Sequence, residues 1–95
     1  GLKMHIAEVT ATNQWQKLED LIKQKVSSFA FENGKEYTIQ NQSNIINLIE
    51  LDAAPTEQNG FSPGVSKEPI IYTKTSGDLY VRALSKSLLV IADNS

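Results

Sequence analysis

Cysteine is absent from this chain of 95 residues, and histidine occurs only once, as His5. The lack of cysteine excludes a disulfide scaffold and a zinc site built on thiolates. No group of carboxylates has the spacing of a metal site or of a catalytic acid–base pair. No nucleophile neighbours His5 in the sequence. We therefore expect a protein that is not an enzyme and that carries no cofactor and no metal.

Concentrated positive charge and long apolar runs are also missing. The nine lysines and arginines are scattered along the chain, and the formal net charge is −2. A nucleic-acid-binding protein needs a concentrated basic face, and a membrane-spanning helix needs about 20 apolar residues in a row. We expect neither nucleic acid nor a membrane among the partners.

One segment has the apolar spacing of a helix. Its apolar side chains recur at steps of three and four: Trp15, Leu18, Leu21, Ile22, Val26 and Phe29. Thr12 and Asn13, just before this segment, are favourable N-cap residues. The pattern predicts an amphipathic helix over residues 13–26, which would plug one open side of the fold or cross one sheet. Residues 1–12 would form an extended N-terminal arm or a weak extra strand, on a segment too short to be an element of the domain by itself.

From Lys35 onward the apolar period changes to two, which indicates five strands, over residues 36–42, 45–51, 70–73, 79–84 and 88–92. The segment 45–51 is apolar on both faces, which predicts a strand that is central or covered on both sides, and residues 42–44 predict a hairpin connection before it. Residues 52–68 contain two prolines and two glycines and predict a long surface loop. We expect a mainly β fold with one domain over residues 13–95. It would be a small antiparallel β-sandwich or barrel of about five strands with one N-terminal amphipathic helix.

Without catalytic groups, the candidate functional residues are those that could contact a partner. The arm carries Met4, Ile6 and Val9, which could add to the sheet edge of another subunit. Phe61 lies in the long loop, where it either docks on the sheet or is presented to a partner.

Tyr80 and Arg82 form a second candidate contact. They lie two residues apart on a predicted strand, so they share one face of it. Both residue types are enriched at protein interfaces, although an ordinary exposed strand face explains them equally well.

Several short segments resemble small structural proteins of tailed bacteriophages and prophages. They are residues 15–21, 29–35 (Phe-Ala-Phe-Glu-Asn-Gly-Lys), 37–41 (Tyr-Thr-Ile-Gln-Asn), 49–50 with 54–56, and 76–83 (Ser-Gly-Asp-Leu-Tyr-Val-Arg-Ala). The similarity spans residues 15–92. Proteins of this kind are β-rich virion components, such as capsid decoration (cement) proteins and head-fibre bases, and they are often symmetric trimers. The resemblance thus implies binding rather than catalysis.

By this resemblance, the protein would be a capsid decoration protein located in the virion. It would bind the outer capsid surface as a homotrimer, contact the major capsid protein or another virion protein, and stabilise the shell. The alternative is a tail- or fibre-associated module for host adhesion or carbohydrate binding, which would use Trp15, Phe61 and Tyr80. Trp15 also heads the apolar stripe of the predicted helix, which favours packing in the core over contact with a sugar.

Overall fold

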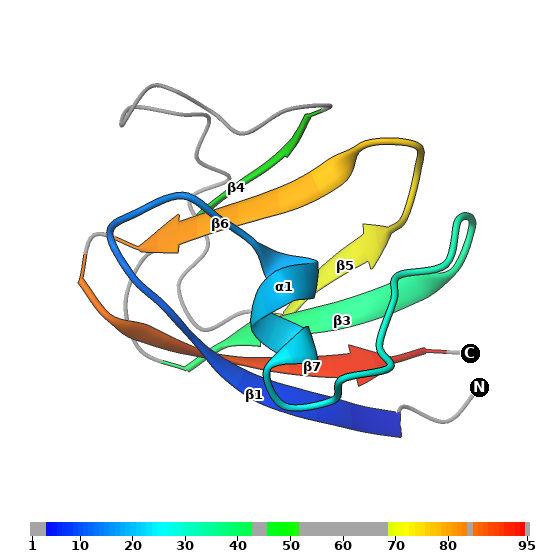
Figure 1. The fold of residues 1–95 in the computed structure, drawn as a ribbon, viewed down its shortest axis with the longest axis horizontal. Coiled ribbons are helices and arrows are strands. Elements are labelled where there is room, and N and C mark those ends of the chain that lie inside the picture. The colour runs from blue at the N-terminus through cyan, green and yellow to red at the C-terminus, as the bar shows by residue number, and fades with distance from the viewer. Residues whose placement is uncertain (1–3, 43–45, 52–68, 84, 95) are drawn as a thin grey trace.

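The chain forms seven strands and one short helix in a computed structural model that describes residues 4–42, 46–51, 69–83 and 85–94 (Figure 1). The elements are β1 (Met4–Ala11), β2 (Gln16–Lys17), α1 (Leu18–Lys23), β3 (Glu36–Asn41), β4 (Ile46–Leu51), β5 (Pro69–Thr73), β6 (Asp78–Ala83) and β7 (Ser87–Asp93). The predicted mainly β character is confirmed. The predicted number of five strands is too low, because β1 and β2 lie in segments assigned to the arm and the helix.

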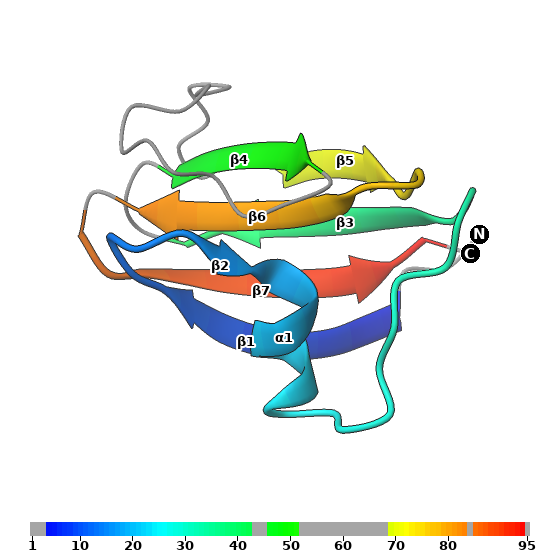
Figure 2. The same ribbon diagram turned by 45° about the horizontal axis from the view of Figure 1, so that its top comes forward.

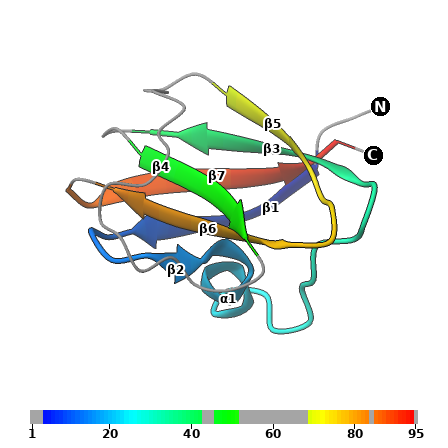
Figure 3. The same cartoon turned by 90° about the horizontal axis from the view of Figure 1, so that it is seen from above.

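The strands form two antiparallel sheets stacked as two layers, visible in Figures 2 and 3. The four-stranded sheet has the order β1-β7-β3-β5, and the three-stranded sheet has the order β2-β6-β4. Every strand pairing in the described residues is antiparallel. Of the two architectures expected, the structure is therefore the sandwich.

Several strands that are neighbours in the sequence lie in different sheets. β3 and β4, on either side of residues 42–44, belong to different layers, so the predicted hairpin connection is wrong. β4 also ends its sheet, whereas β6 holds the central position predicted for residues 45–51. The alternation of apolar residues shows that a strand has a face to bury, but it does not encode which strand lies beside it.

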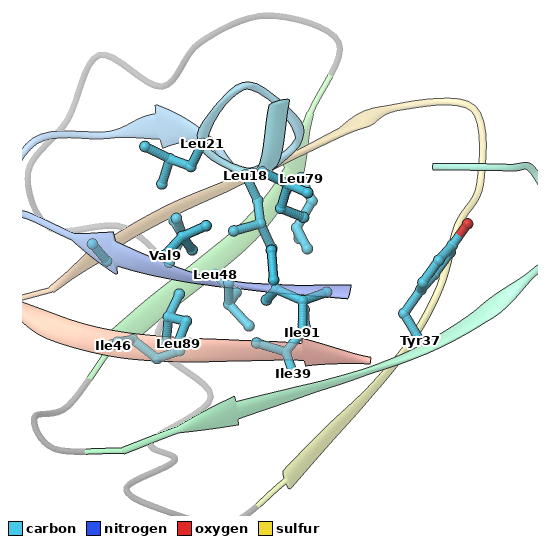
Figure 4. Packing of buried hydrophobic residues seen from close by; sticks show 14 of the residues in the cluster. Val9, Leu18, Leu21, Tyr37, Ile39, Ile46, Leu48, Leu79, Leu89 and Ile91 are labelled. Carbon is cyan, nitrogen blue, oxygen red and sulfur yellow. The ribbon is translucent and has the colours of Figure 1, made fainter. Parts of the chain in front are cut away.

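The core lies between the two sheets (Figure 4). Ile39 and Ile91 are directly paired on the four-stranded sheet and are fully buried, as is Val81 on β6 of the other sheet. Removing one such side chain from water contributes about 1.5–3 kcal/mol to folding. Because the buried side chains of both sheets belong to one cluster, the layers stabilise each other.

Residues 4–11 form the strand β1 of the domain, so the assignment of these residues to an arm is wrong and the alternative of an extra strand is the one found. β1 pairs with β7 along its length, with a register shift between His5 and Ala7. Ala7, Val9 and Ala11 are buried in the core. Two of these inward positions hold alanine, whose small side chain produces only weak apolar alternation, and the sequence pattern consequently looked irregular.

The helix α1 has six residues and is much shorter than the helix predicted over residues 13–26. Gln16 and Lys17 pair with β6 instead, and Lys17 is the N-cap without a side-chain capping bond. Leu18, Leu21 and Ile22 are buried against the core. α1 contacts β1, β2 and β6 and covers the side where β1 and β2 end their sheets (Figure 3), which confirms that the helix closes one open side.

Beyond α1, the chain stays against the core without being helical. Four aromatic rings pack edge to face there: Phe29, Phe31, Tyr37 and Tyr72. The Phe31 N–H donates to Oε1 of Glu19 at 2.8 Å, and the Glu32 N–H donates to the Tyr37 hydroxyl at 2.9 Å. Apolar spacing therefore continues past residue 23 because the apolar side chains of this segment pack against the core, not because it is a helix.

Candidate binding surface

The four-stranded sheet has a second face, which is directed away from the core. Residues paired directly across neighbouring strands share a face, so one row contains Glu8, Val90, Gln40 and Pro69. We call this surface the outer face. Its residues are His5, Glu8 and Thr10 on β1, Leu88, Val90 and Ala92 on β7, Glu36, Thr38 and Gln40 on β3, and Pro69, Ile71 and Thr73 on β5.

The outer face is apolar at several exposed positions and carries little charge. The strands β1, β3, β5 and β7 contain no lysine and no arginine, and the carboxylates of the outer face are Glu8 and Glu36. Ile71 is 54% exposed and Leu88 is 39% exposed. A sheet surface of this kind suits contact with another protein, because burial of exposed apolar side chains stabilises association.

One end of the outer face is held by hydrogen bonds. The Thr38 hydroxyl donates to Oδ1 of Asn94 at 2.7 Å, and the Asn94 amide donates to Oε1 of Glu36 at 3.0 Å. The Asn94 N–H also donates to the Glu36 carbonyl at 3.1 Å. These contacts fix the polar end of the surface before a partner binds, which reduces the conformational entropy lost on binding.

The partner contacts predicted on residues 4–9 occupy three different environments. Met4 is 65% exposed at the start of β1, and Ile6 is partly buried against the core. Val9 is only 3% exposed and lies in the core, so its assignment as a partner contact is wrong. Phe61 lies outside the described residues.

Tyr80 and Arg82 are buried instead of forming an exposed strand face. Each is 7% exposed on β6, the central strand of the three-stranded sheet. The Arg82 guanidinium carbon lies 5.6 Å from the centre of the Trp15 ring, a cation–π contact. The prediction of an accessible contact at these two residues is therefore wrong for the folded chain.

The same contact decides the environment of Trp15. This residue is partly buried and lies outside the main core cluster, and Arg82 covers one face of its ring. Trp15 is thus neither a core residue, as the apolar spacing suggested, nor an uncovered platform for a sugar. Because 67 residues separate the two partners, no local sequence pattern indicates their contact.

Tyr72 and Glu50 connect the two sheets on the side where β4 and β5 are the end strands. The Tyr72 hydroxyl donates to Oε1 of Glu50 at 3.1 Å, and the Thr75 N–H donates to the same oxygen at 3.3 Å. Burial raises the pKa of the Tyr72 phenol above its ordinary value, and the negative charge of Glu50 raises it further. Tyr72 therefore remains a hydrogen-bond donor across the neutral and mildly alkaline range.

Charged groups elsewhere form ion pairs between elements. Lys35 Nζ lies 2.7 Å from Oδ2 of Asp93, and this hydrogen bond raises the pKa of Lys35. Lys17 Nζ similarly lies 3.4 Å from Oδ2 of Asp78.

Within the described part of the chain, no group of three His, Cys, Asp or Glu residues is placed to hold a metal ion. No helix among these residues is long and apolar enough to cross a membrane.

Comparisons of the chain with protein-family models, with curated proteins and with solved structures find no match.

Proposed function

We propose that this chain is a structural protein of a tailed-bacteriophage virion that works by binding protein and not by catalysis. In this proposal it is a capsid decoration protein on the outer capsid surface, and it forms a symmetric homo-oligomer. The observation that supports binding is the outer face, which exposes Ile71 and Leu88 and carries no lysine or arginine. The virion location and the trimeric state rest on the resemblance carried by residues 15–92.

The proposed mechanism is multivalent attachment through the outer face. Each copy contributes one apolar contact to the major capsid protein, and copies joined in one oligomer bind with an avidity well above that of one contact. A protein that binds only the assembled shell stabilises the shell by mass action. The absence of lysine and arginine from the outer face favours a partner surface that is apolar in its centre and not strongly acidic.

The test introduces one positive charge into this contact. Leu88→Lys places an ammonium group on the outer face, whereas Gln24→Lys adds the same charge at an exposed position just after α1. Purified undecorated capsids from a panel of tailed phages are mixed with each protein and sedimented. We expect wild type and Gln24→Lys to co-sediment with at least one capsid, and Leu88→Lys to bind at least tenfold more weakly, a loss of about 1.4 kcal/mol or more.

Light scattering of the same three proteins gives their mass in solution. A wild-type protein that is a strict monomer at all concentrations would rule out the symmetric oligomer. Failure to bind any capsid would count against the virion location. Equal binding by Leu88→Lys and wild type would remove the outer face from the contact, even if the virion location were correct.

A further inference from the structure

The turn before β3 contains asparagine followed by glycine, at Asn33 and Gly34, and both residues are exposed. The Lys35 N–H donates to the Glu32 carbonyl at 3.1 Å, which closes a four-residue β-turn. Gly34 has a φ of 81°, in the left-handed region that other residues rarely adopt. The turn therefore requires glycine directly after an asparagine.

This pair of residues can react without an enzyme. The backbone nitrogen of Gly34 can form a bond to Cγ of Asn33 while the Cγ–Nδ2 bond breaks. Nδ2 leaves as ammonia, carrying the proton that the Gly34 amide loses. The resulting cyclic imide takes up water at either carbonyl and opens to aspartate or to isoaspartate. Glycine presents no Cβ to hinder the attack.

The fold holds the attacking nitrogen in an unreactive state. The Gly34 N–H donates to the carbonyl of Lys74 at 2.8 Å, and the Lys74 N–H donates back to the Lys35 carbonyl at 3.1 Å. Ring closure requires the Gly34 nitrogen to lose its proton and to rotate towards its own neighbour. Both changes break the bond to Lys74.

We propose that Asn33 is a site of spontaneous deamidation that the fold protects through the hydrogen bond from Gly34 to Lys74. The reaction proceeds only when the end of the β3–β5 pair opens, so its rate reports the population of that open state. The product places a new carboxylate next to Glu32, close to the ion pair between Lys35 and Asp93. The isoaspartate form also lengthens the backbone of the turn by one bond.

The experiment measures conversion at Asn33 over time by peptide mapping with mass spectrometry, at mildly alkaline pH. Wild type is incubated folded and, in parallel, unfolded in urea at the same pH and temperature. We expect the folded protein to react at least tenfold more slowly, which corresponds to about 1.4 kcal/mol of local protection. Asn33→Ser has no side-chain amide and serves as the assay blank.

A variant weakens the pairing of Lys74 with the turn by removing the hydrogen bond next to that of Gly34. Lys74→Pro lacks the N–H that donates to Lys35, so in a folded sample conversion should be faster than in wild type. If this variant does not fold, wild type in urea below its unfolding transition replaces it and should show the same acceleration. Equal rates in folded and unfolded wild type would show that the fold gives no protection. No conversion at Asn33 in the unfolded chain would show that it is not a deamidation site.

Discussion

At the scale of single residues, polar contacts join distant parts of the sequence. The hydrogen bond from Tyr72 to Glu50 spans the two sheets, and the contact of Arg82 with Trp15 joins β6 to the segment before β2. In the described residues, no buried side-chain nitrogen or oxygen lacks a hydrogen-bond partner. Removing one side chain of such a pair therefore leaves the other without a hydrogen-bond partner, which lowers the stability of the fold by about 1–3 kcal/mol when that group is buried.

Tyr72→Phe tests the hydrogen bond to Glu50 and its pH dependence. Because folding raises the pKa of Tyr72, the unfolded chain loses the phenol proton first, near pH 10. The contribution of Tyr72 to stability is thus fully present below about pH 10 and is lost as the pH rises further. We expect the variant to be less stable than wild type at neutral pH, and to lose less stability above about pH 10.

The measurement is urea-induced unfolding followed by circular dichroism at neutral and at alkaline pH. Tyr80→Phe serves as the matched control, because it removes a phenol outside the Tyr72–Glu50 contact. A stability difference between Tyr72→Phe and wild type that stays constant from neutral to alkaline pH would show that the phenol proton is not linked to folding.

At the scale of elements, β1 is the strand whose role differs most from the sequence-based expectation. It supplies three buried side chains to the core and pairs along its whole length with β7. An arm could be removed without harm to the domain. An integral strand cannot be removed in this way, since its loss exposes the core beneath it.

Deletion of residues 1–10 separates these two cases. We expect the shortened protein to be unfolded or only partly folded, because a domain is stabilised by only about 5–15 kcal/mol and β1 contributes a substantial part of the core. Far-UV circular dichroism and a thermal melt of the shortened and full-length chains provide the measurement. A cooperative melt at the wild-type temperature would show that β1 is a dispensable arm after all.

Individual strands could be predicted from the sequence, but their neighbours could not. The five strands from β3 to β7 begin and end within about two residues of their predicted limits, because each alternates strongly enough to identify its buried face. The pairing of β1 with β7 and the separation of β3 from β4 depend on contacts between distant segments. Val26 and Phe29 continued a helical spacing although only residues 18–23 are helical, because burial alone can produce that spacing.

The candidate site could not be predicted from the sequence. β5 and β7 are apolar at consecutive positions, so the pattern does not show that Ile71 and Leu88 are the exposed ones, and the assembly of one outer face requires the strand order. The burial of Val9, Tyr80 and Arg82 depends on neighbours supplied by the fold. Residue type alone identified Tyr80 and Arg82 as interface residues, and their actual partners lie within the chain.

At the scale of the whole molecule, one core joins both sheets, so the sandwich should unfold as a single unit. Ile39→Ala removes a core side chain from the four-stranded sheet. Trp15, the fluorescent probe, contacts β6 of the other sheet. We expect this variant to lose about 2–5 kcal/mol of stability. Fluorescence of Trp15, the only tryptophan, and circular dichroism should give the same unfolding midpoint.

Val81→Ala is the corresponding variant on the three-stranded sheet, and both signals should again shift together. Two separate midpoints in either variant would show that the layers unfold independently.

The register of β1 and β7 has one more consequence, because Met4 lies directly opposite Asp93. The first and last strands begin and end at the same corner of the four-stranded sheet (Figure 1). A short peptide joining these positions would make the backbone a closed loop, and the chain could then be cut open elsewhere as a circular permutant with the same strand order. This corner lies at the opposite end of the sheet from the pair of Leu88 and Thr10.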